Sequence, residues 1–535
     1  MKLLLSFLIA LSILFPTQAQ QDPFQIYLEP VTIEGLPGIQ SFAFGQYQGL
    51  WLIIGGRIDG LHRRQPWATF NPEGRNTQLT VIDPVAHKIW TASLTSLPLH
   101  IQDQLSSTNM EFYQDGKFLY VTGGYGYSQT IDAKLTFAML TAIDVPGAIA
   151  AVQDRENLSP YFRSITDVQF AVTGGHLNKI FDTYYLVGGQ KFDGNYNPMN
   201  HPSFTQEYSN GIRKFLIEDD GVDLKVTHLS TLTDTAAFHR RDYNVGPLIL
   251  PTGEEGLMSF SGPFQIQADL PYLNVVRIDS QSYQMEPGFA QYYNNYHCAM
   301  LPLYSASNGE MHTIFFGGIA QYYEENGTLV QDNEVPFVKT IARITRDNNG
   351  QLSEYKLPVE MPGYLGASAE FIPVDFIPGY DNGVIKLDEL DPDTAMVGYI
   401  YGGISSSAAN IFFINEGTES VAHPVIYKVY VIRNTTTSIH ALNDQSHNGL
   451  RMQIYPNPNH GTFNIQFHLR EKIKMVLTIS DDRGKVLVKE DISDQLLRGD
   501  NRIEQRFKPF KIGGIYFVTL TTPDDMITQK IIVKE

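Results

Sequence analysis

The stretch "KFLYVTGGYGYS" (residues 117–128) is an apolar strand that runs into two glycines and then into tyrosines. The same pattern recurs in "TYYLVGGQ" (183–190), "HTIFFGGI" (312–319) and "VGYIYGGI" (397–404), and Gly55-Gly56 ends a fifth strand. A degenerate sixth copy, "GLMSFSGPF" (256–264), keeps only Gly262 of the pair. One pattern that returns every 55 to 85 residues indicates a repeat architecture.

Each repeat predicts four strands. Two strands joined by a turn precede the glycine pair, as in "NMEFYQDGKFLYVTGG" (109–124), where Asp115-Gly116 is a hairpin signal. A third strand ends in Asp or Asn, as at Asp83, Asp144 and Asn434, where the side chain can start a turn into a fourth strand. Six units of four strands predict an all-β fold, a six-bladed β-propeller.

The third and fourth strands of the first unit, "TQLTVIDPVAHKIWTASLTSLP" (77–98), contain a tryptophan at Trp90. Together with the glycine pairs, this stretch resembles the kelch repeat, over about residues 24–434. The resemblance implies a kelch-like propeller but no particular activity, because propellers host unrelated functions. The N-terminal "FQIYLEPVTIEGLPG" (24–38) is similar to "LSEYKLPVEMPG" (352–363) of unit five. We therefore expect it to complete the last blade and close the ring, leaving no free strand edge.

The first 19 residues are predicted to be a signal peptide. Lys2 supplies a positive charge, Leu3 to Phe15 an apolar run, and Thr17-Gln18-Ala19 a cleavage site. The apolar run is too short for a membrane anchor, which needs about 20 residues, and we expect no transmembrane segment. The single cysteine, Cys298, excludes an intramolecular disulfide. We therefore expect an exported protein whose propeller, residues 20–434, is held together by packing alone.

The charge of the chain is distributed unevenly. The formal charge is −18, whereas residues 451–535 hold 14 Lys and Arg against 11 Asp and Glu, so the part before them carries −21. An acidic surface repels the phosphate backbone of nucleic acids. We therefore expect no nucleic acid partner.

A polar stretch, residues 435–450, is predicted to link the propeller to a second domain, residues 451–535. That tail resembles the C-terminal sorting domain of the type IX secretion system of Bacteroidetes. The residues that carry the resemblance are Tyr455, Pro456, Asn457, Pro458, Gly461, Gly484 and Tyr516. The resemblance implies a small Ig-like β-sandwich, the secretion machinery and its sortase-like protease as partners, and a product that is secreted or attached to the outer-membrane surface. An adhesive Ig-like module is the alternative.

The loops after the glycine pairs and the loops that lead into each first strand share one face of a propeller. The candidate ligand-binding residues on them are His62, Arg63, Arg64, Tyr125, Tyr127, Tyr196, Arg240, Arg241, Tyr292, Tyr296, His297, Tyr322 and Glu324. Aromatic planes beside arginines suit sugars, anionic groups or peptide side chains. The alternative is structural, because kelch repeats commonly place Arg or His where Arg241 and His297 stand, and loop tyrosines often only pack.

Catalytic motifs are scarce. The chain contains no GxSxG, HExxH or Walker sequence, and we predict no catalytic residue, metal or cofactor. The cluster of tyrosines and histidines around Cys298 resembles the residues that kelch-type copper radical oxidases need, a Tyr–Cys crosslink and a Tyr/His metal set. Cys298 falls in a predicted first strand, however, which favours a buried thiol. The sequence thus predicts an exported propeller that binds a glycan or a protein. The alternative is a carbohydrate-active enzyme, sialic-acid mutarotase-like or sugar oxidase-like, in which Arg241, His297 and Glu324 converge.

Overall fold

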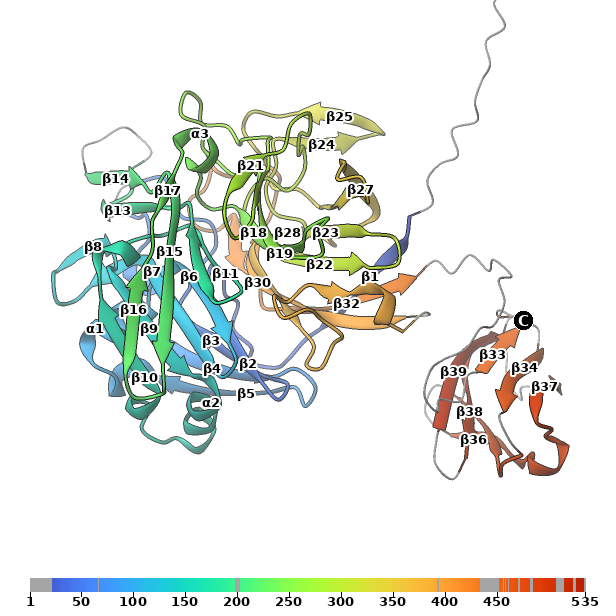
Figure 1. Cartoon of the computed structure of the whole chain (residues 1–535). Helices are drawn as coiled ribbons and strands as arrows, with labels where there is room; N and C mark the ends of the chain where they lie inside the picture. The colour runs from blue at the N-terminus through green and yellow to red at the C-terminus, as the bar shows by residue number, and fades with distance from the viewer. Residues whose placement is uncertain are drawn as a thin grey trace, which may run out of the picture. The chain divides into compact units, whose positions relative to one another are not determined.

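The computed structural model describes residues 22–65, 67–197, 203–391, 394–433, 452–455, 457, 459, 461–469, 472–481, 485–506, 514–522 and 526–533. The chain divides into two compact units, Met1–Thr435 and Thr436–Glu535, each described by itself (Figure 1). The predicted signal peptide and the predicted linker lie outside the described residues. In the part described, no helix is both long and apolar enough to cross a membrane.

The described part of the first unit forms six main sheets, as an all-β fold requires. The first three consist of β2 (Ala43–Tyr47), β3 (Leu50–Ile54), β4 (Gln78–Asp83) and β5 (Lys88–Ser93); of β6 (Thr108–Asp115), β7 (Phe118–Ser128), β9 (Met139–Asp144) and β10 (Phe162–Thr166), with β8 (Ala133–Thr136) beside β7; and of β11 (His176–Ile180), β12 (Thr183–Val187), β15 (Gly211–Asp219) and β16 (Leu224–His228), with β17 (Leu232–Thr233) beside β15. In each, four strands pair antiparallel in chain order.

Sheets four to six repeat this arrangement. They consist of β18 (Asn244–Ile249), β19 (Glu255–Phe260), β20 (Val276–Ile278) and β21 (Tyr283–Met285); of β22 (Met300–Ser305), β23 (Glu310–Phe316), β26 (Thr340–Arg346) and β27 (Leu352–Glu360), with β29 (Ile385–Lys386) parallel to β22; and of β28 (Tyr364–Pro373), β30 (Ala395–Ser406), β32 (Ile426–Arg433) and β1 (Phe24–Val31), with β31 (Ser420–Ala422) beside β30.

Connecting segments add two hairpins and three short helices to the described part. The hairpins are β13 (Gln190–Gly194) with β14 (Phe204–Tyr208) and β24 (Tyr322–Glu325) with β25 (Thr328–Gln331), and the helices are α1 (Leu99–Leu105), α2 (Val145–Asp154) and α3 (Thr235–Phe238). Each hairpin follows a glycine pair, and both stand at the upper edge of the unit in Figure 1. They therefore mark the face that carries the loops after the glycine pairs.

The N-terminal strand completes the sixth sheet, as the sequence predicted. Phe24 lies opposite Arg433 and Val31 opposite Ile426, so β1 is the outermost strand beside β32. Glu29 accepts hydrogen bonds from Lys428 Nζ (2.9 Å) and from the Tyr430 hydroxyl (3.0 Å). The first and last strands of the unit are thereby joined.

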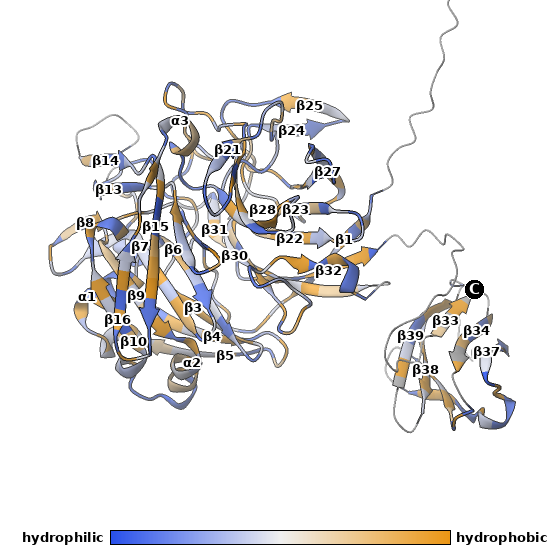
Figure 2. Cartoon of the chain, in the orientation of Figure 1, coloured by the Kyte–Doolittle hydropathy of each residue, from blue (hydrophilic) through white to orange (hydrophobic). Residues whose placement is uncertain are grey.

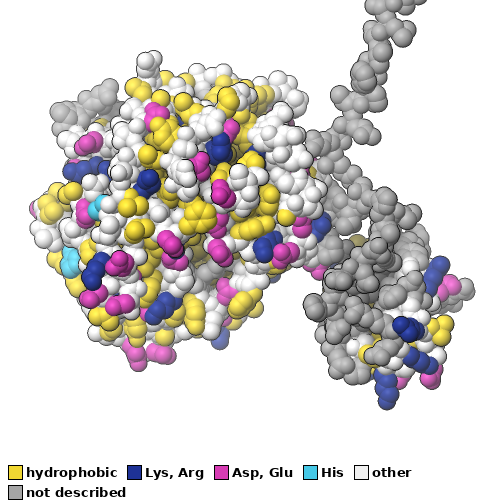
Figure 3. Space-filling view, in the orientation of Figure 1, with side chains coloured by type: hydrophobic (Ala, Val, Ile, Leu, Met, Phe, Trp, Pro, Cys, Tyr) yellow, Lys and Arg dark blue, Asp and Glu magenta, His cyan; other side chains and the backbone are white. Residues whose placement is uncertain are grey.

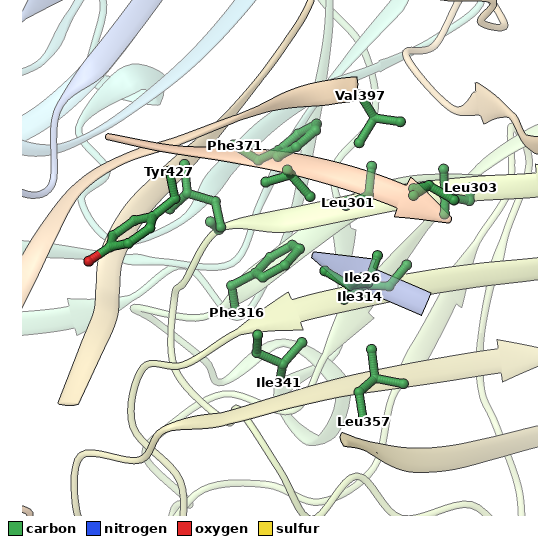
Figure 4. Close-up of a cluster of buried hydrophobic side chains, with 14 of the residues drawn as sticks. Ile26, Leu301, Leu303, Ile314, Phe316, Ile341, Leu357, Phe371, Val397 and Tyr427 are labelled. Atoms are coloured by element: carbon green, nitrogen blue, oxygen red, sulfur yellow. The ribbon is translucent and has the colours of Figure 1, made fainter. Parts of the chain in front are cut away.

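Hydrophobic clusters fill the space between successive sheets. The largest joins sheets five and six through side chains such as Phe316, Leu301 and Phe371 (Figure 4). Another joins sheet six to sheet one, where Trp51 packs edge-on against Tyr399 with ring centroids 4.9 Å apart. Hydrophobic residues recur along the strands of the sheets, between hydrophilic ones (Figure 2). Burial of this apolar surface, rather than any disulfide, holds the sheets together.

The glycine pairs are the points where one sheet meets the next. The second glycine of five pairs donates its backbone N–H to a carbonyl at the start of the next first strand or just before it: Gly56 to Ser107, Gly124 to Val172, Gly189 to Arg240, Gly318 to Leu365 and Gly403 to Ile39, at 2.8 to 2.9 Å. A Cβ on the preceding glycine would collide with the same region, for example 1.8 Å from the Val172 oxygen at Gly123. Glycine also allows the positive φ of both positions.

Six backbone hydrogen bonds close a ring through the six units. Asn109 N donates to Ser41 O, Gly174 to Asn109, Asp242 to Gly174, His297 to Asp242, Ser368 to His297 and Ser41 to Ser368, at 2.7 to 3.2 Å. We call these six residues the axial ring. All but His297 have positive φ between 50° and 67°. The circuit is unbroken, and its last bond, from Ser41 N to Ser368 O, joins the sixth unit to the first.

The second unit consists of two antiparallel sheets over one hydrophobic cluster in its described part. The sheets are β33 (Met452–Tyr455), β34 (Thr462–Leu469) and β37 (Gly499–Arg506), and β36 (Val486–Asp491), β35 (Val476–Asp481), β38 (Gly514–Thr521) and β39 (Met526–Val533). Phe463 and Ile465 of the first sheet and Leu477 and Val518 of the second are fully buried in the shared cluster. The unit therefore has its own core.

Candidate functional site

A cavity of about 1240 Å³ lies at the centre of the first unit. Each first strand contributes a wall residue: Phe44, Phe112, Leu177, Val245, Met300 and Phe371. All six residues of the axial ring line the cavity as well. The cavity is thus the space around which the six sheets are arranged, and it exceeds the volume of most small-molecule sites.

The structure brings seven of the thirteen predicted site residues to this cavity: His62, Arg64, Tyr125, Tyr196, Arg241, Tyr296 and His297. Some of these side chains also pack on one another. The His62 ring is stacked on Phe70 (4.8 Å) and edge-on to Tyr196 (4.9 Å), and burial lowers the pKa of His62 to about 4. The Tyr125 hydroxyl donates to Gly194 O (2.6 Å). Both residues therefore shape the wall.

Five other predicted residues, which lie on loops or at strand ends beyond them, do not line the cavity. Arg63 faces Glu416 (3.6 Å), and the Tyr127 hydroxyl donates to Asp132 (2.6 Å). Tyr292 and Tyr322 pack edge-on against each other at 4.9 Å. Glu324 accepts from the Tyr293 hydroxyl (3.0 Å) and faces Lys356 (3.6 Å). The expected convergence of Arg241, His297 and Glu324 is therefore wrong for Glu324.

Arg240 is the thirteenth predicted residue, and it is fully buried. Its Nε donates to Ala237 O (2.8 Å), Nη1 to the carbonyls of Ser261 and Asn274, and Nη2 to Asn274 Oδ1 (2.6 Å). Its guanidinium also covers the Tyr272 ring at 4.6 Å. A ligand cannot reach this side chain, so Arg240 is a structural residue that fixes the start of sheet four.

Arg241 faces the cavity and is enclosed by aromatic side chains. Its guanidinium lies 4.3 Å from the Phe264 ring centroid and 5.4 Å from that of Tyr208. Nη1 donates to the Tyr208 hydroxyl and to Gln190 Oε1 (3.4 Å), and Nε lies 3.3 Å from Asp242 Oδ2. Burial opposes the charge, but Tyr208 and Asp242 outweigh burial and raise the pKa of Arg241. The cavity thus holds a permanent positive charge.

Asp242 is held in place from across the axial ring. Its Oδ1 accepts from Asn109 Nδ2 (2.8 Å), although the third unit separates these residues in the chain. Gly174 is the ring residue between them, and a Cβ there would lie 2.6 Å from Asp242 Oδ1. Burial raises the pKa of Asp242 against the opposing effect of Arg241. The missing side chain at position 174 therefore allows Asn109 to orient the partner of Arg241.

His297 and Glu370 form a second pair, with Nε2 and Oε1 3.2 Å apart. Burial disfavours charge on His297, but Glu370 and Asp242 outweigh it and raise the pKa of His297. The neighbouring His176 ring lies edge-on at 5.3 Å, and burial with the charge of His297 lowers the pKa of His176 to about 3. The surroundings therefore favour the cationic form of His297 and the neutral form of His176.

Sequence reasoning missed Asn109, Asp242, Glu370 and Tyr208. A signal existed in the first three units, where Ser41, Asn109 and Gly174 each stand 14 positions before the first glycine of the pair. The spacing changes in the later units, so the equivalence of Asp242, His297 and Ser368 is visible only in the structure.

Cys298 is buried beside the cavity, where Sγ accepts from Asn244 Nδ2 (3.4 Å), but it precedes β22 rather than lying within it. Within the described ranges, no cluster of three or more His, Cys, Asp or Glu is arranged to hold a metal ion.

In the tail, an asparagine just after β33 is hydrogen-bonded to the last strand. Asn457 Nδ2 donates to Lys530 O and Asn457 Oδ1 accepts from Ile532 N, both at 2.8 Å, so this side chain makes two hydrogen bonds to one edge of β39. Gly461 has φ +87° and donates to Asn459 Oδ1 (2.7 Å), and Tyr516 is buried. Pro456, Pro458 and Gly484 lie outside the described residues.

Residues 453–534 match the family model of the secretion system C-terminal sorting domain. The sorting domain predicted from the sequence is thereby confirmed, within one or two residues of the predicted limits. Such a domain marks a protein for export, which agrees with an outer-membrane or cell-surface location.

Two solved structures are similar to the chain. One is a fungal alcohol oxidase of the AA5 family in complex with copper, at 10% identity over 96% of this chain and 100% of that chain, with a TM-score of 0.39. The other is described as the structure of YjhT, at 10% identity over 73% of this chain and 99% of that chain, also with a TM-score of 0.39. A search of curated proteins found no match. This level of similarity assigns no activity to the chain.

Proposed function

We propose that this protein is a six-bladed kelch-like propeller that binds a glycan or a protein ligand in its central cavity. Residues 1–19 are its signal peptide, residues 20–434 the propeller, residues 435–450 a linker and residues 451–535 an Ig-like sorting domain read by the type IX secretion machinery and its sortase-like protease. The bound ligand meets the face that carries the loops after the glycine pairs. The mature protein works in the medium or on the outer-membrane surface of a member of the Bacteroidetes.

The central cavity is the observation that carries the binding function. Its wall combines the aromatic side chains of Phe264, Phe412 and Tyr296 with the guanidinium groups of Arg64 and Arg241. Concave sites of this composition, mostly apolar with a few polar groups, are typical of small-molecule and sugar sites. Acidic side chains are spread over the face shown in Figure 3, and no broad basic surface is visible there, which disfavours nucleic acid.

A glycan and protein array tests the binding function directly. The full-length chain should bind at least one ligand, and Tyr296→Ala, in the cavity wall, should weaken that binding at least tenfold, about 1.4 kcal/mol. Tyr292→Ala is the matched control, because Tyr292 lies outside the cavity wall. An array without ligands, or equal effects of the two variants, would contradict the proposal.

The alternative enzymatic function is favoured by the charged groups of the cavity. His297, Glu370, Asp242 and Arg241 meet there, and three of them have shifted pKa values. Such clusters are candidate sites of proton transfer. Incubation of the full-length chain with reducing sugars, with anomeric exchange followed by NMR and oxygen consumption by an electrode, tests this function. Turnover that is lost in Glu370→Gln would support it, and unchanged sugars would exclude both reactions for those substrates.

A further inference from the structure

We propose that Arg241, Tyr196 and Tyr296 form a carboxylate-binding subsite in the central cavity. The proposal rests on the binding function above and specifies its ligand class, a polar, ring-sized molecule with a single carboxylate, such as an oligosaccharide that contains one hexuronate residue. Three hydrogen-bond donors, rather than any catalytic motif, define the subsite.

One donor on each of these three side chains makes no hydrogen bond within the described part of the protein. Among the residues that the structure describes, Arg241 Nη2 has no hydrogen-bond acceptor, although Nη1 and Nε both have partners. Over the same residues, the hydroxyls of Tyr196 and Tyr296 also have no partner, whereas those of Tyr125 and Tyr208 do. All three donors belong to side chains that line the cavity. All three residues are part-buried in the cavity wall, so their unused donors are accessible to an acceptor-rich ligand group.

The surroundings strengthen an interaction with a carboxylate. The aromatic rings of Phe264 and Tyr208 flank the Arg241 guanidinium, which leaves its planar edge as the accessible part. Tyr208 and Asp242 contribute most to the raised pKa of Arg241, and the phenols of Tyr196 and Tyr296 add to it because they lie close to its charge. Tyr196 is close to Arg64 as well. Arg64 contributes a second guanidinium, which covers the Phe413 ring at 4.5 Å. A charged donor in a partly dry site makes a shorter and stronger hydrogen bond than a neutral donor.

The protein fixes the direction of Arg241 without cancelling its charge. Asp242 Oδ2 lies 3.3 Å from Arg241 Nε, and Asp242 is itself held by Asn109 through the gap that Gly174 leaves. Asn109 and Asp242 are therefore positioning residues. Glu370 is matched by His297, and Glu111 accepts from Gly175 N (2.9 Å) deep in the wall. Asp269, Glu334 and Asp381 also line the cavity and oppose a second anionic group, which favours one carboxylate over a polyanion.

Calorimetry on the full-length chain tests the subsite with an aldobiuronic acid, a disaccharide with one glucuronate, and with its methyl ester. The ester keeps the shape of the ligand and removes its charge. The acid should bind at least about tenfold more tightly than the ester, and Arg241→Lys should lose about tenfold for the acid, as expected for a lost charge-assisted hydrogen bond. Tyr296→Phe, which removes one hydroxyl and preserves the ring, should lose about threefold to tenfold.

Matched controls lie on the same face outside the cavity wall. Arg63→Lys and Tyr292→Phe repeat the two chemical changes there and should leave the affinity within about twofold. Equal binding of acid and ester would overturn the subsite and leave the binding function standing. No binding of the acid would also overturn it, and the array decides separately on the binding function. Tighter binding of glucose 6-sulfate than of the acid would assign the subsite to sulfate and overturn the carboxylate.

Discussion

Arg240 and Arg241 are neighbours in the chain, yet they occupy opposite environments. Every nitrogen of the Arg240 guanidinium donates to an oxygen of sheet four or its loops, and burial lowers the pKa of Arg240 to about 10. Arg241 instead meets side chains and keeps a free edge toward the cavity, with a raised pKa. The number of hydrogen bonds that each guanidinium already makes, rather than the residue type, therefore distinguishes the structural arginine from the arginine proposed to bind a ligand.

The largest expected effect is on stability at Arg240. Arg240→Met should lower the free energy of unfolding of the first unit by roughly 3–5 kcal/mol, because several acceptors lose a charged donor at about 1–3 kcal/mol each. Arg241→Met should cost less than about 1 kcal/mol, since few of its bonds are to backbone. Urea denaturation of the two variants measures both values. Similar losses would mean that Arg241 is also a structural residue.

Gly174→Ala is expected to have the next largest effect. The new Cβ would lie 2.6 Å from Asp242 Oδ1, at a φ of +67°. Gly49→Ala is the matched control, because Gly49 has φ +78° but open space around it. In both variants, an alanine in the left-handed conformation should lower the free energy of unfolding by about 1–2 kcal/mol. Gly174→Ala should cost about 1–2 kcal/mol more for the clash, and it should also weaken ligand binding. Equal losses of unfolding free energy in the two variants would show that the first unit does not need the Asn109–Asp242 contact for its stability.

A smaller effect concerns pH. The raised pKa of His297 means that its pairing with Glu370 stabilises the fold fully below about pH 6.5, the unfolded value, and less as the pH rises through the folded-state pKa. Glu370→Gln should therefore be less stable than the wild type by about 1 kcal/mol near pH 6, and the gap should narrow toward pH 9. A gap that widens with rising pH would refute this pairing.

The smallest expected effect is that of removing the tail. Because the axial ring and β1 close the first unit without any residue of the second, deletion of residues 451–535 should change its unfolding midpoint by no more than the error of the measurement. The same deletion should retain the protein in the periplasm of its host. Fractionation and denaturation test the two parts separately. Normal export of the shortened chain would contradict the sorting function.

The sequence predicts the parts of this fold that depend on one residue type. Gly123 and Gly402 are recognisable because no other residue fits beside Val172 O and Ile39 O. The axial ring is hidden, since Ser41, Asn109 and Asp242 share a backbone position but not a side chain. The position of Glu324 in the loop after a glycine pair also led to the wrong prediction of the carboxylate that lies beside His297. Glu324 lies in an exposed hairpin, whereas Glu370 lies in the mostly apolar strand β28, so only the folded chain shows which carboxylate faces His297.

The position of a bound ligand tests the central claim most directly. A crystal structure of the full-length chain with the aldobiuronic acid should place the carboxylate in the central cavity, about 2.7–2.9 Å from Arg241 Nη2 and within hydrogen-bonding distance of the Tyr196 and Tyr296 hydroxyls. Arg240 should keep its contacts unchanged. A ligand bound on the outer loops, for example beside Tyr292 and Tyr322, with the Arg241 edge still unoccupied, would contradict the account.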